Sequence, residues 1–445
     1  MAKAAGGLSP RALRENFAEI HPALTANAAV AEASRCLYCY DAPCTRACPT
    51  HIDVPGFIYR ILHRDAVGAA EVILDANIFG GSCARVCPTE VLCEGACVDN
   101  TLLNDPIQIG RLQRFACDSA DEREIDFHQP GPDTGKSVAV VGAGPAGLTC
   151  AHELRKHGHR VVVFEAGKVA GGLNTLGIAA YKISTQYALS EVHRVQRMGL
   201  DLRFRKPIDG AALARLLGEH DAVFLGVGLG ATTRLNIPGE DKPGVWEALE
   251  FIYQTHTGPL NKARVGRRVV VIGGGNTAID AAVAARKLGA EEVIIAYRRD
   301  RDAMPAFHHE YELAAAQGVH FEWLARPLRV VLRQGRACGV RFARNRLQGT
   351  GRQARLIRVP RSDFTLPADM VIKALGQVTR RDLLMTVPRL KIARDGNVKV
   401  DPATHATSVP RLFAGGDCVN GGKEVVDAVQ AGKIAAAGIH RMLSE

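Results

Sequence analysis

The pattern of apolar and polar positions changes near residue 130 of the chain. Before this point, apolar residues recur at helical spacing in short segments such as 54–62 and 66–74, which we therefore predict to be helices. After it, short runs of β-branched residues alternate with segments of helical length, which is typical of a parallel sheet covered by helices. The stretch 129–135 is rich in proline and glycine and predicts a linker between the two regions.

Two strand–helix–strand units can be recognised in the second region, and each predicts a pair of parallel strands. The first unit comprises Ser137–Val141, Ala146–His157 and Arg160–Phe164. The second comprises Arg268–Ile272, Thr277–Leu288 and Glu292–Tyr297. Near the carboxyl end, the segment Leu412–Cys418 precedes a predicted helix of small residues, Glu424–Met442. We expect an α/β protein in which a helical domain is followed by two Rossmann-like dinucleotide-binding domains.

The composition is that of an ordinary globular chain, with 47% hydrophobic residues among 445. No run approaches the roughly 18 consecutive apolar residues that predict a membrane-spanning helix. Residues 1–10 lack the apolar core of a signal peptide. We therefore expect a cytoplasmic protein with no membrane association.

The formal net charge is +10, and much of the excess lies in one segment. Eleven arginines lie between Arg326 and Arg361 inclusive, without an acidic residue among them. This segment predicts either a solvated, strand-rich surface or a docking face for an acidic partner or a dinucleotide phosphate. Nucleic-acid binding is not expected, because no aromatic stacking platform or recognition motif accompanies the charge.

Nine of the twelve cysteines precede residue 120, and eight of these nine form two groups. The groups are Cys36-x2-Cys39-x4-Cys44-x3-Cys48 and Cys83-x3-Cys87-x4-Cys93-x3-Cys97. Thiolates are the ligands of iron–sulfur clusters, and a 4Fe-4S cluster needs four such ligands or three and a substitute. Two zinc sites would use as many cysteines, but zinc sites favour paired Cys-x2-Cys spacings and only one such pair occurs. The spacing therefore favours iron–sulfur clusters over zinc.

In each unit, one glycine-rich turn follows the first strand. Gly142-Ala-Gly-Pro-Ala-Gly147 opens a helix, and Glu165 ends the next strand, where an acid accepts a hydrogen bond from a ribose hydroxyl. The second turn is Gly273-Gly-Gly-Asn-Thr-Ala278, and its following strand ends in Arg298 and Arg299 instead of an acid. Arginines at this position suit a 2′-phosphate and favour NADPH, although they could also be surface residues.

Residues 31–58, AEASRCLYCYDAPCTRACPTHIDVPGFI, resemble the amino-terminal domain of dihydropyrimidine dehydrogenase. The small subunit of glutamate synthase is similar but more distant. The resemblance covers the whole chain, since the flavin and nicotinamide motifs follow in the same order. It implies two interleaved 4Fe-4S sites, the first held by Cys36, Cys39, Cys44 and Cys97. The second would be held by Cys48, Cys87, Cys93 and Gln113, although spacing alone would have chosen Cys83 instead of Gln113.

The resemblance also implies that the first turn binds FAD and that the second binds NAD(P)H. Three segments resemble those of flavoproteins in this family and support FAD: Gly171-Gly-Leu-Asn174, Leu412–Asp417 and the helix start at Glu424. The implied FAD residues are Gly142, Ala143, Gly144, Pro145, Ala146, Glu165, Gly172, Leu173, Lys182, Gly416, Asp417, Glu424, Val425 and Val426. The implied NAD(P) residues are Gly273, Gly274, Gly275, Asn276, Thr277, Arg298, Arg299, Ala374, Leu375 and Gly376. Mammalian relatives use NADPH and similar bacterial ones are NAD-dependent, so the choice between NADH and NADPH stays open.

These assignments predict four segments: residues 1–130 for the clusters, 131–260 and 368–445 for FAD, and 261–367 for NAD(P). Hydride would pass directly between the cofactors, so no side chain need act as a catalytic acid or base. The resemblance implies an electron-input subunit whose partner carries FMN and reduces uracil or thymine in pyrimidine catabolism. Two alternatives are the small subunit of glutamate synthase, feeding an amidotransferase, and a non-enzymatic, zinc-stabilised interaction protein.

Overall fold

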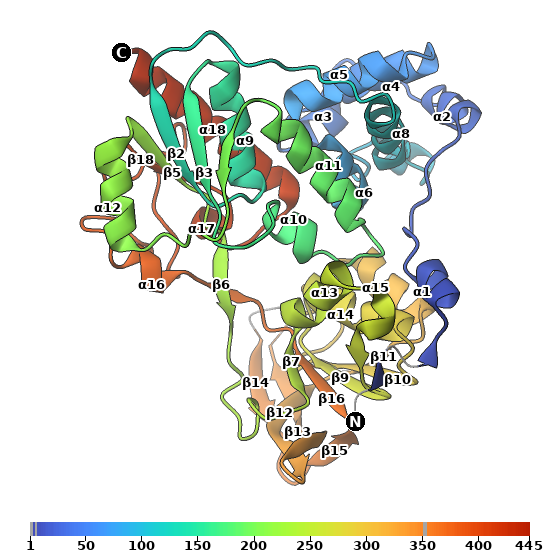
Figure 1. Cartoon of the computed structure of the whole chain (residues 1–445). Helices are drawn as coiled ribbons and strands as arrows, with labels where there is room; N and C mark the ends of the chain where they lie inside the picture. Colours follow the sequence, from blue (N-terminus) through green and yellow to red (C-terminus); the bar gives the residue numbers. More distant parts are fainter. Residues whose placement is uncertain (1–2, 5–6, 350–353) are drawn as a thin grey trace. The chain divides into compact units, whose positions relative to one another are not determined.

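The computed structural model describes residues 3–4, 7–349 and 354–445, which form two compact units (Figure 1). Unit 1 comprises residues 1–20, 176–184 and 231–377. Unit 2 comprises residues 21–175, 185–230 and 378–445. Two of the boundaries fall within strands β6 (Leu229–Thr232) and β17 (Gln377–Thr379).

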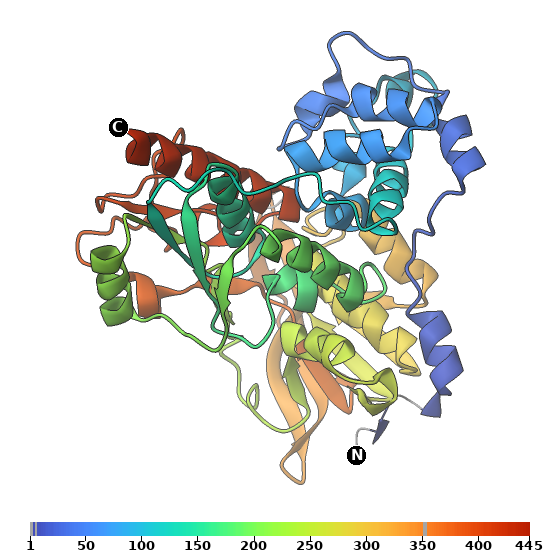
Figure 2. The same ribbon diagram turned by 45° about the horizontal axis from the view of Figure 1, so that its top comes forward.

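The helical part of unit 2 is a bundle of short helices that share one apolar core (Figure 2). Its helices are α2 (Ala26–Ala33), α3 (Pro43–Ala47), α4 (Val54–Leu62), α5 (Ala66–Ala76), α6 (Gly80–Val86), α7 (Val98–Leu102) and α8 (Ile109–Asp121). A single turn of 3-10 helix spans Thr89–Val91. Asp53 and Asp65 cap α4 and α5, because each carboxylate accepts a hydrogen bond from a backbone amide of the first turn.

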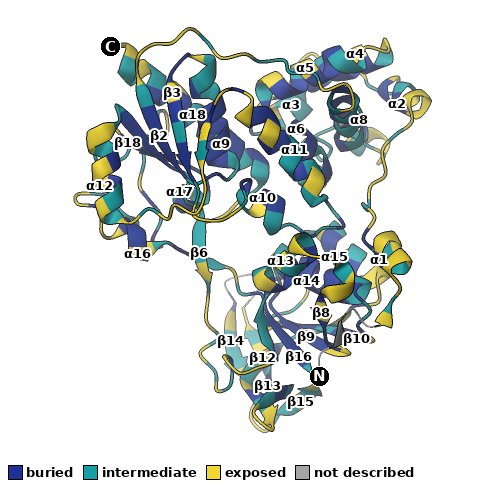
Figure 3. Ribbon diagram, viewed as in Figure 1, coloured by how far each residue is buried: buried dark blue, intermediate teal, exposed yellow. Residues whose placement is uncertain are grey.

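A five-stranded parallel sheet with the order β18-β5-β2-β3-β4 forms the rest of unit 2. The strands are β2 (Ser137–Val141), β3 (Arg160–Phe164), β4 (Asp201–Arg203), β5 (Ala222–Leu225) and β18 (Leu412–Ala414). Residues 138–141 of β2 and all residues of β5 and β18 are buried (Figure 3). One face packs against α9 (Pro145–Lys156), α11 (Thr185–Gln196) and α18 (Val425–Ser444). The other packs against α12 (Gly210–Glu219) and α16 (Arg381–Leu384).

Unit 1 contains a second parallel sheet, with the order β11-β10-β9-β16-β7. Its strands are β7 (Val245–Glu247), β9 (Arg268–Ile272), β10 (Glu292–Ala296), β11 (His320–Glu322) and β16 (Met370–Lys373). Helices α1 (Pro10–Asn16), α13 (Ala248–Thr257), α14 (Asn276–Lys287) and α15 (His308–Ala316) contribute to the core on one face. Short strands at β1 (Lys3–Ala4) and β8 (Arg264–Val265) pair with each other.

An antiparallel sheet carries most of the arginine-rich segment of unit 1. It is built from β12 (Ala325–Arg333), β13 (Arg336–Gln348), β14 (Arg355–Arg358) and β15 (Phe364–Pro367). Arg329 and Arg341 are exposed and lie directly opposite each other on neighbouring strands. Arg352, which the sequence places in this segment, lies outside the described residues.

The predicted α/β fold class is confirmed, and the two predicted strand–helix–strand units are present. The strands β2, β3 and β9 have the predicted bounds, while α9 and α14 each begin and end one residue earlier than predicted. Residues 129–135 form neither helix nor strand. Helix α1, which the prediction grouped with the cluster-binding helices, belongs to unit 1. Within the described ranges, no helix has both the length and the apolar content needed to cross a membrane.

Candidate iron–sulfur and dinucleotide sites

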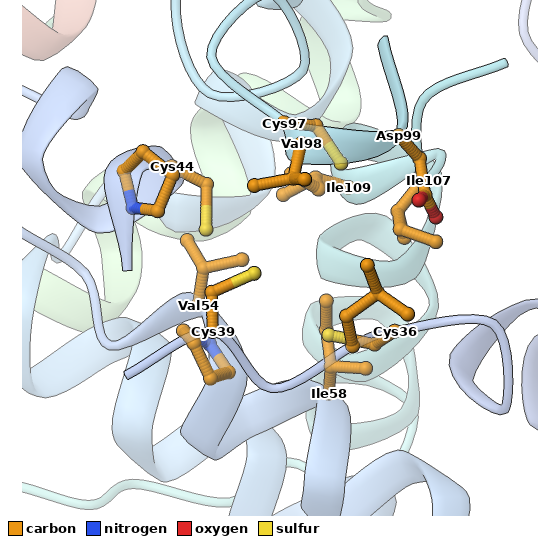
Figure 4. A pocket seen from close by; sticks show the side chains of 13 residues that line it. Cys36, Cys39, Cys44, Val54, Ile58, Cys97, Val98, Asp99, Ile107 and Ile109 are labelled. Atoms are coloured by element: carbon orange, nitrogen blue, oxygen red, sulfur yellow. The ribbon is translucent and has the colours of Figure 1, made fainter. Parts of the chain in front are cut away.

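Four predicted cluster ligands line one pocket in the helical part of unit 2 (Figure 4). Cys36 and Cys39 lie in the loop after α2, Cys44 lies on α3, and Cys97 immediately precedes α7. All four are free cysteines around a space of about 380 Å³. Apolar side chains complete much of the wall, among them Val54, Ile58, Ile107 and Ile109. We call these four cysteines the first cysteine group.

The thiols of this group raise one another's pKa. Burial raises the pKa of Cys36, and the neighbouring Cys39 and Cys97 raise it further. Burial likewise raises the pKa of Cys44 to about 11, with further contributions from Cys36 and Cys97. Thiolates gathered this closely need positive charge to offset their repulsion, and bound iron supplies it. Four convergent thiols around a shared space therefore fit a 4Fe-4S cluster.

A second set of thiols lies nearby, around α6 and the turn that follows it. Burial and a hydrogen bond with Cys83 raise the pKa of Cys87 well above its usual value, the hydrogen bond contributing most, and Cys93 and Cys48 raise it further. Burial raises the pKa of Cys93, with smaller contributions from Glu94 and Cys48. We call Cys48, Cys87 and Cys93 the second cysteine group, and they are the three thiols that the resemblance assigns to the second cluster.

The fourth ligand beside this group has two candidates, Cys83 and Gln113, and the structure shows the contacts of each. Cys83 lies against Cys87, and its sulfur accepts a hydrogen bond from Asn77 Nδ2 at 3.2 Å. Gln113, on α8, is only 7% exposed, and its Nε2 donates to the carbonyl oxygen of Gly80 at 2.6 Å. That hydrogen bond leaves the other end of the amide, Oε1, as the atom that could bind iron. Ligation by Gln113 stays a prediction.

The described ranges contain no set of three His, Cys, Asp or Glu side chains close enough together to hold a single metal ion. The fit to iron–sulfur therefore rests on the pocket of the first cysteine group and on the chemistry of its thiols.

The first glycine-rich turn has the geometry that a dinucleotide pyrophosphate requires. Gly142 has φ +102°, and a Cβ there would lie 2.3 Å from the carbonyl oxygen of Gly226. A Cβ on Gly147 would lie 2.0 Å from the carbonyl oxygen of Gly142, so only glycine allows α9 to pack this closely. At Gly144, by contrast, a Cβ would meet no atom within 4 Å. This open side at the start of a helix is where a pyrophosphate can approach the backbone.

Other predicted FAD residues lie around this turn. Glu165 accepts hydrogen bonds from the amides of Ala143 at 3.0 Å and Gly167 at 2.6 Å, and so fixes the turn to the end of β3. Gly172 lies against Gly144, where an added Cβ would approach the Gly144 Cα to 3.0 Å. Leu173, on the same segment, is 41% exposed. Pro145 is the first residue of α9.

The carboxyl-terminal FAD residues reach the same turn from β18. Gly416 has φ +73°, and a Cβ there would lie 2.9 Å from the Cβ of Ala146. Asp417 begins the short helix α17 (Asp417–Asn420), and burial raises its pKa. Glu424 caps α18, whose first residues are Val425 and Val426. The structure therefore brings together predicted FAD residues that are far apart in the sequence.

The second glycine-rich turn, in unit 1, repeats this geometry. Gly273 has φ +151°, and a Cβ there would lie 2.1 Å from the carbonyl oxygen of Ala374. Gly275 faces open space, and the third position is the buried Ala278. Asn276 Oδ1 accepts a hydrogen bond from the amide of Phe307 at 3.0 Å, which places the following loop beside the turn. The remaining predicted residues of this region are Gly274 and Thr277 in the turn and Leu375 and Gly376 after β16.

The two predicted phosphate-binding arginines differ in their surroundings. Arg298 is exposed at the end of β10, whereas Arg299 is half-buried and donates to the carbonyl oxygen of Ala354 at 2.9 Å. Arg298 is therefore the better placed of the two to meet a 2′-phosphate, and its role stays a prediction.

Lys182 lies in unit 1, in the segment 176–184 that interrupts unit 2. Its ammonium group is buried between two carboxylates, at 2.7 Å from Asp280 and in a short contact with Glu310. Burial lowers the pKa of Lys182, but the two carboxylates raise it, and the net direction is upward. The structure thus places Lys182 in an ion-pair network that the sequence did not indicate. Its role at the flavin stays a prediction.

Two buried acidic residues near the cysteines were missed by the sequence interpretation. Asp99 lines the pocket of the first cysteine group and is 4% exposed. Glu191 is fully buried on α11, among the apolar residues Ala188, Val192 and Val195. The available signal for Glu191 was an acidic residue among apolar residues at helical spacing, since such residues are rarely buried without a partner.

Two family models match the chain, one after the other. Residues 13–125 match dihydropyrimidine dehydrogenase domain II with a 4Fe-4S cluster. Residues 136–432 match pyridine nucleotide-disulphide oxidoreductase. The first match covers both cysteine groups, and the second covers both glycine-rich turns.

Similar proteins include subunits of several different enzymes. The chain is 34% identical to the NAD-dependent dihydropyrimidine dehydrogenase subunit PreT of Escherichia coli, over 96% of this chain and 97% of that protein. It is also 34% identical to the glutamate synthase [NADPH] small chain of E. coli, over 96% and 94%. Identity to the NADP(+)-dependent formate dehydrogenase subunit beta of Moorella thermoacetica is 35% over 91% of this chain, which spans only 60% of that protein.

Among solved structures, FprA of Mycobacterium tuberculosis in complex with NADPH is similar in fold. The TM-score is 0.55 at 19% sequence identity, over 70% of this chain and 85% of that chain.

Proposed function

We propose that this chain, which belongs to the pyridine nucleotide-disulphide oxidoreductase family, is the electron-input subunit of a dihydropyrimidine dehydrogenase. The chain is an oxidoreductase that uses iron–sulfur, FAD and NAD(P)H. In the proposed role it passes electrons from NAD(P)H, through FAD and two 4Fe-4S clusters, to a partner subunit. That partner would carry FMN and reduce uracil or thymine to the dihydropyrimidine.

The observation that carries the proposal is the content of unit 2. This one compact unit holds a glycine-rich turn with an open side and, in the same chain segment, the pocket of the first cysteine group. When bound, a flavin takes electrons in pairs and can release them singly, which is the form that iron–sulfur clusters accept.

The chain's own residues bind and orient the cofactors. In the proposed role, Gly144 leaves room for the FAD pyrophosphate, and Asp417 lies where the carboxyl-terminal segment meets the same turn. Gly275 leaves the corresponding room for NAD(P)H in unit 1. No side chain has to move a proton for a direct hydride transfer, so the protein's contribution is orientation and electrostatics.

The proposal that the acceptor is a pyrimidine-reducing subunit is supported by the match of residues 13–125 and by similarity to the dihydropyrimidine dehydrogenase subunit over nearly its whole length. A cytoplasmic location is part of the same proposal. The relatives are named as subunits of larger enzymes, which supports a partner subunit for this chain as well.

Anaerobic purification of the chain provides the test. We expect flavin absorption with a broad cluster shoulder and about eight irons per chain, as two 4Fe-4S clusters require. We also expect NAD(P)H-dependent reduction of ferricyanide but no uracil reduction until the partner is added. A colourless, zinc-containing protein would refute the proposal, and uracil reduction by the isolated chain would refute the subunit role.

A second candidate is the small subunit of glutamate synthase, because the identity to that subunit is the same 34% over nearly the same length. Co-purification from the native host separates the two. A partner with FMN and pyrimidine reduction supports the first candidate, and a glutamine amidotransferase partner supports the second.

A further inference from the structure

Helix α6, which leads to Cys87, is capped by a residue distant in the sequence. Phe79 precedes the helix and provides no side-chain hydrogen bond to its backbone. Instead, Glu191 Oε1, on α11, accepts hydrogen bonds from the amides of Gly81 at 3.0 Å and Ser82 at 3.1 Å. Glu191 therefore satisfies two of the amides that the first turn of any helix leaves without an intrahelical partner.

The same carboxylate ends a chain of side-chain hydrogen bonds. Asn174 Nδ2 donates to Ser82 Oγ at 2.8 Å, and Ser82 Oγ makes a short hydrogen bond with Glu191 Oε2. The three residues are 1%, 0% and 0% exposed. When Glu191 is ionised, its carboxylate only accepts and the Asn174 NH2 only donates, so the hydroxyl then accepts from Asn174 and donates to Glu191. The chain of hydrogen bonds thus runs in one direction.

The two ends of this chain lie at different predicted cofactor sites. Asn174 ends the segment 171–174, in which the amide of Gly171 donates to the carbonyl oxygen of Ala143 at 2.7 Å. Ala143 belongs to the first glycine-rich turn. At the other end, Ser82 immediately precedes Cys83, which is hydrogen-bonded to Cys87 of the second cysteine group. Three side chains therefore connect the glycine-rich turn to α6, the helix that carries Cys83 and ends at Cys87.

Close packing leaves α6 little room to shift. A Cβ on Gly81 would lie 1.7 Å from the hydroxyl oxygen of Tyr187, so this contact requires glycine. The guanidinium of Arg85 lies 3.5 Å from the centre of the Tyr187 ring and donates to Asp118 at 2.7 Å. A helix held this closely can transmit a small change in its cap to the cysteines at its end.

We propose that Glu191 is a positioning residue that, through Ser82 and Asn174, fixes the second cysteine group relative to the first glycine-rich turn. The inference rests on the proposed function, in which electrons pass from the flavin at that turn to the clusters. Glu191 touches neither cofactor site itself and acts through the hydrogen bonds of Ser82.

Glu191→Gln tests the proposal because it can keep the hydrogen bonds to the α6 amides while breaking the hydrogen bond with Ser82 Oγ. The Gln carbonyl oxygen can still accept from the two α6 amides, but its NH2 group would face Ser82 Oγ and remove the acceptor that the hydroxyl needs. We expect full iron and flavin content and unchanged hydrogen–deuterium exchange of residues 79–87. We expect an altered EPR signal of the second cysteine group after dithionite reduction, with the signal of the first group unchanged.

Rapid mixing with NAD(P)H provides the second measurement. We expect flavin bleaching within twofold of the wild-type rate and cluster reduction slower by on the order of tenfold, the size expected for losing a hydrogen bond to a charged group. Ser82→Ala removes the middle residue of the hydrogen-bond chain and should reproduce both effects. Cluster reduction in the double variant, Ser82→Ala with Glu191→Gln, should be no slower than in either single variant. Glu153→Gln, a matched change of another largely buried carboxylate of unit 2 that is hydrogen-bonded to His152, should change neither.

Unchanged EPR signals and unchanged cluster reduction in both Glu191→Gln and Ser82→Ala would overturn the proposal and leave Glu191 as a helix cap alone. Because dithionite reduces the clusters without NAD(P)H, the EPR measurement tests the link independently of the proposed function. If NAD(P)H does not bleach the wild-type flavin, the proposed function fails while the EPR result still decides the role of Glu191.

Discussion

The two cysteine groups differ in how they are connected to the rest of unit 2. The first group surrounds a pocket that belongs entirely to the helical part, with Asp99 in its wall. In the second group, Cys87 immediately follows α6, whose first turn is held by Glu191 of the sheet-containing part. The comparison indicates that the first group is contained within the helical part, whereas the second group is also connected, through α6, to the sheet-containing part of unit 2.

The largest expected effect is the loss of one site without the other. Cys44→Ser removes one thiolate of the first cysteine group, so we expect roughly half of the iron and acid-labile sulfide to be lost. The EPR signal of the second group and flavin bleaching by NAD(P)H should remain. Cys338→Ser, in unit 1, is the matched control and should retain all the iron. Full iron content in Cys44→Ser would contradict the assignment of the first group.

The next effect concerns the fourth ligand of the second group. We expect Gln113→Ala to disturb the second cluster and spare the first. Cys83→Ser should keep the iron, because the Cys83 sulfur lies between Asn77 and Cys87 as a hydrogen-bonding neighbour. Iron analysis and EPR of both variants provide the measurement. The reverse outcome would assign the ligand to Cys83.

A smaller effect is expected for the reduction potential of the first site. Asp99→Asn removes a buried negative charge from the pocket wall, which should make the potential of that site more positive by on the order of 50 mV. Asp105→Asn is the matched control, because its carboxylate is 69% exposed and screened by water. Redox titration followed by EPR measures both. Equal shifts in the two variants would exclude a specific effect of Asp99.

The smallest expected effect is a pH dependence of the free energy of unfolding that comes from Glu191, next to the second cysteine group. Burial raises the pKa of Glu191 from 4.5 to about 7, although Ser82, Arg85 and Gly81 oppose the shift. The folded protein binds the Glu191 proton more tightly than the unfolded protein does. Protonation of Glu191 therefore adds to the free energy of unfolding; this contribution is complete below about pH 4.5 and is lost as the pH rises through about 7. The total is about 3 kcal/mol, because one pKa unit corresponds to about 1.4 kcal/mol.

Thermal unfolding of the wild type and Glu191→Gln at pH 5.5 and pH 8.5 measures this contribution. The wild type should lose more stability than the variant between these two pH values, because glutamine has no proton to release. Glu153→Gln should not remove the difference. Parallel pH profiles of wild type and Glu191→Gln would show that Glu191 does not titrate in this range.

Much of the fold was predictable because local sequence determines it. Strands β2, β3 and β9 are mostly valine, with a charged residue at or just before the start of each, and their bounds were predicted correctly. The glycine-rich turns were predictable for the same reason, since each glycine meets a local backbone constraint. Helix ends were less certain, because Pro145 and Asn276 extend α9 and α14 by one residue at the start.

What could not be predicted depends on contacts between distant segments. The sequence placed Lys182 at the flavin on the basis of resemblance alone and gave no indication of Asp280 and Glu310 beside it. Glu191 was missed because its partners, Gly81 and Ser82, are more than a hundred residues away. The grouping of Cys97 with Cys36 likewise came from resemblance, since spacing alone does not show which thiols converge.

The position of β18 beside β5 has a consequence for biosynthesis. The sheet of unit 2 gains this edge strand only when residues 412–414 have left the ribosome, long after its cysteines have been translated. Long-range parallel pairing of this kind forms slowly. A premature stop before β18 would therefore leave β5 as an unpaired edge of the sheet of unit 2.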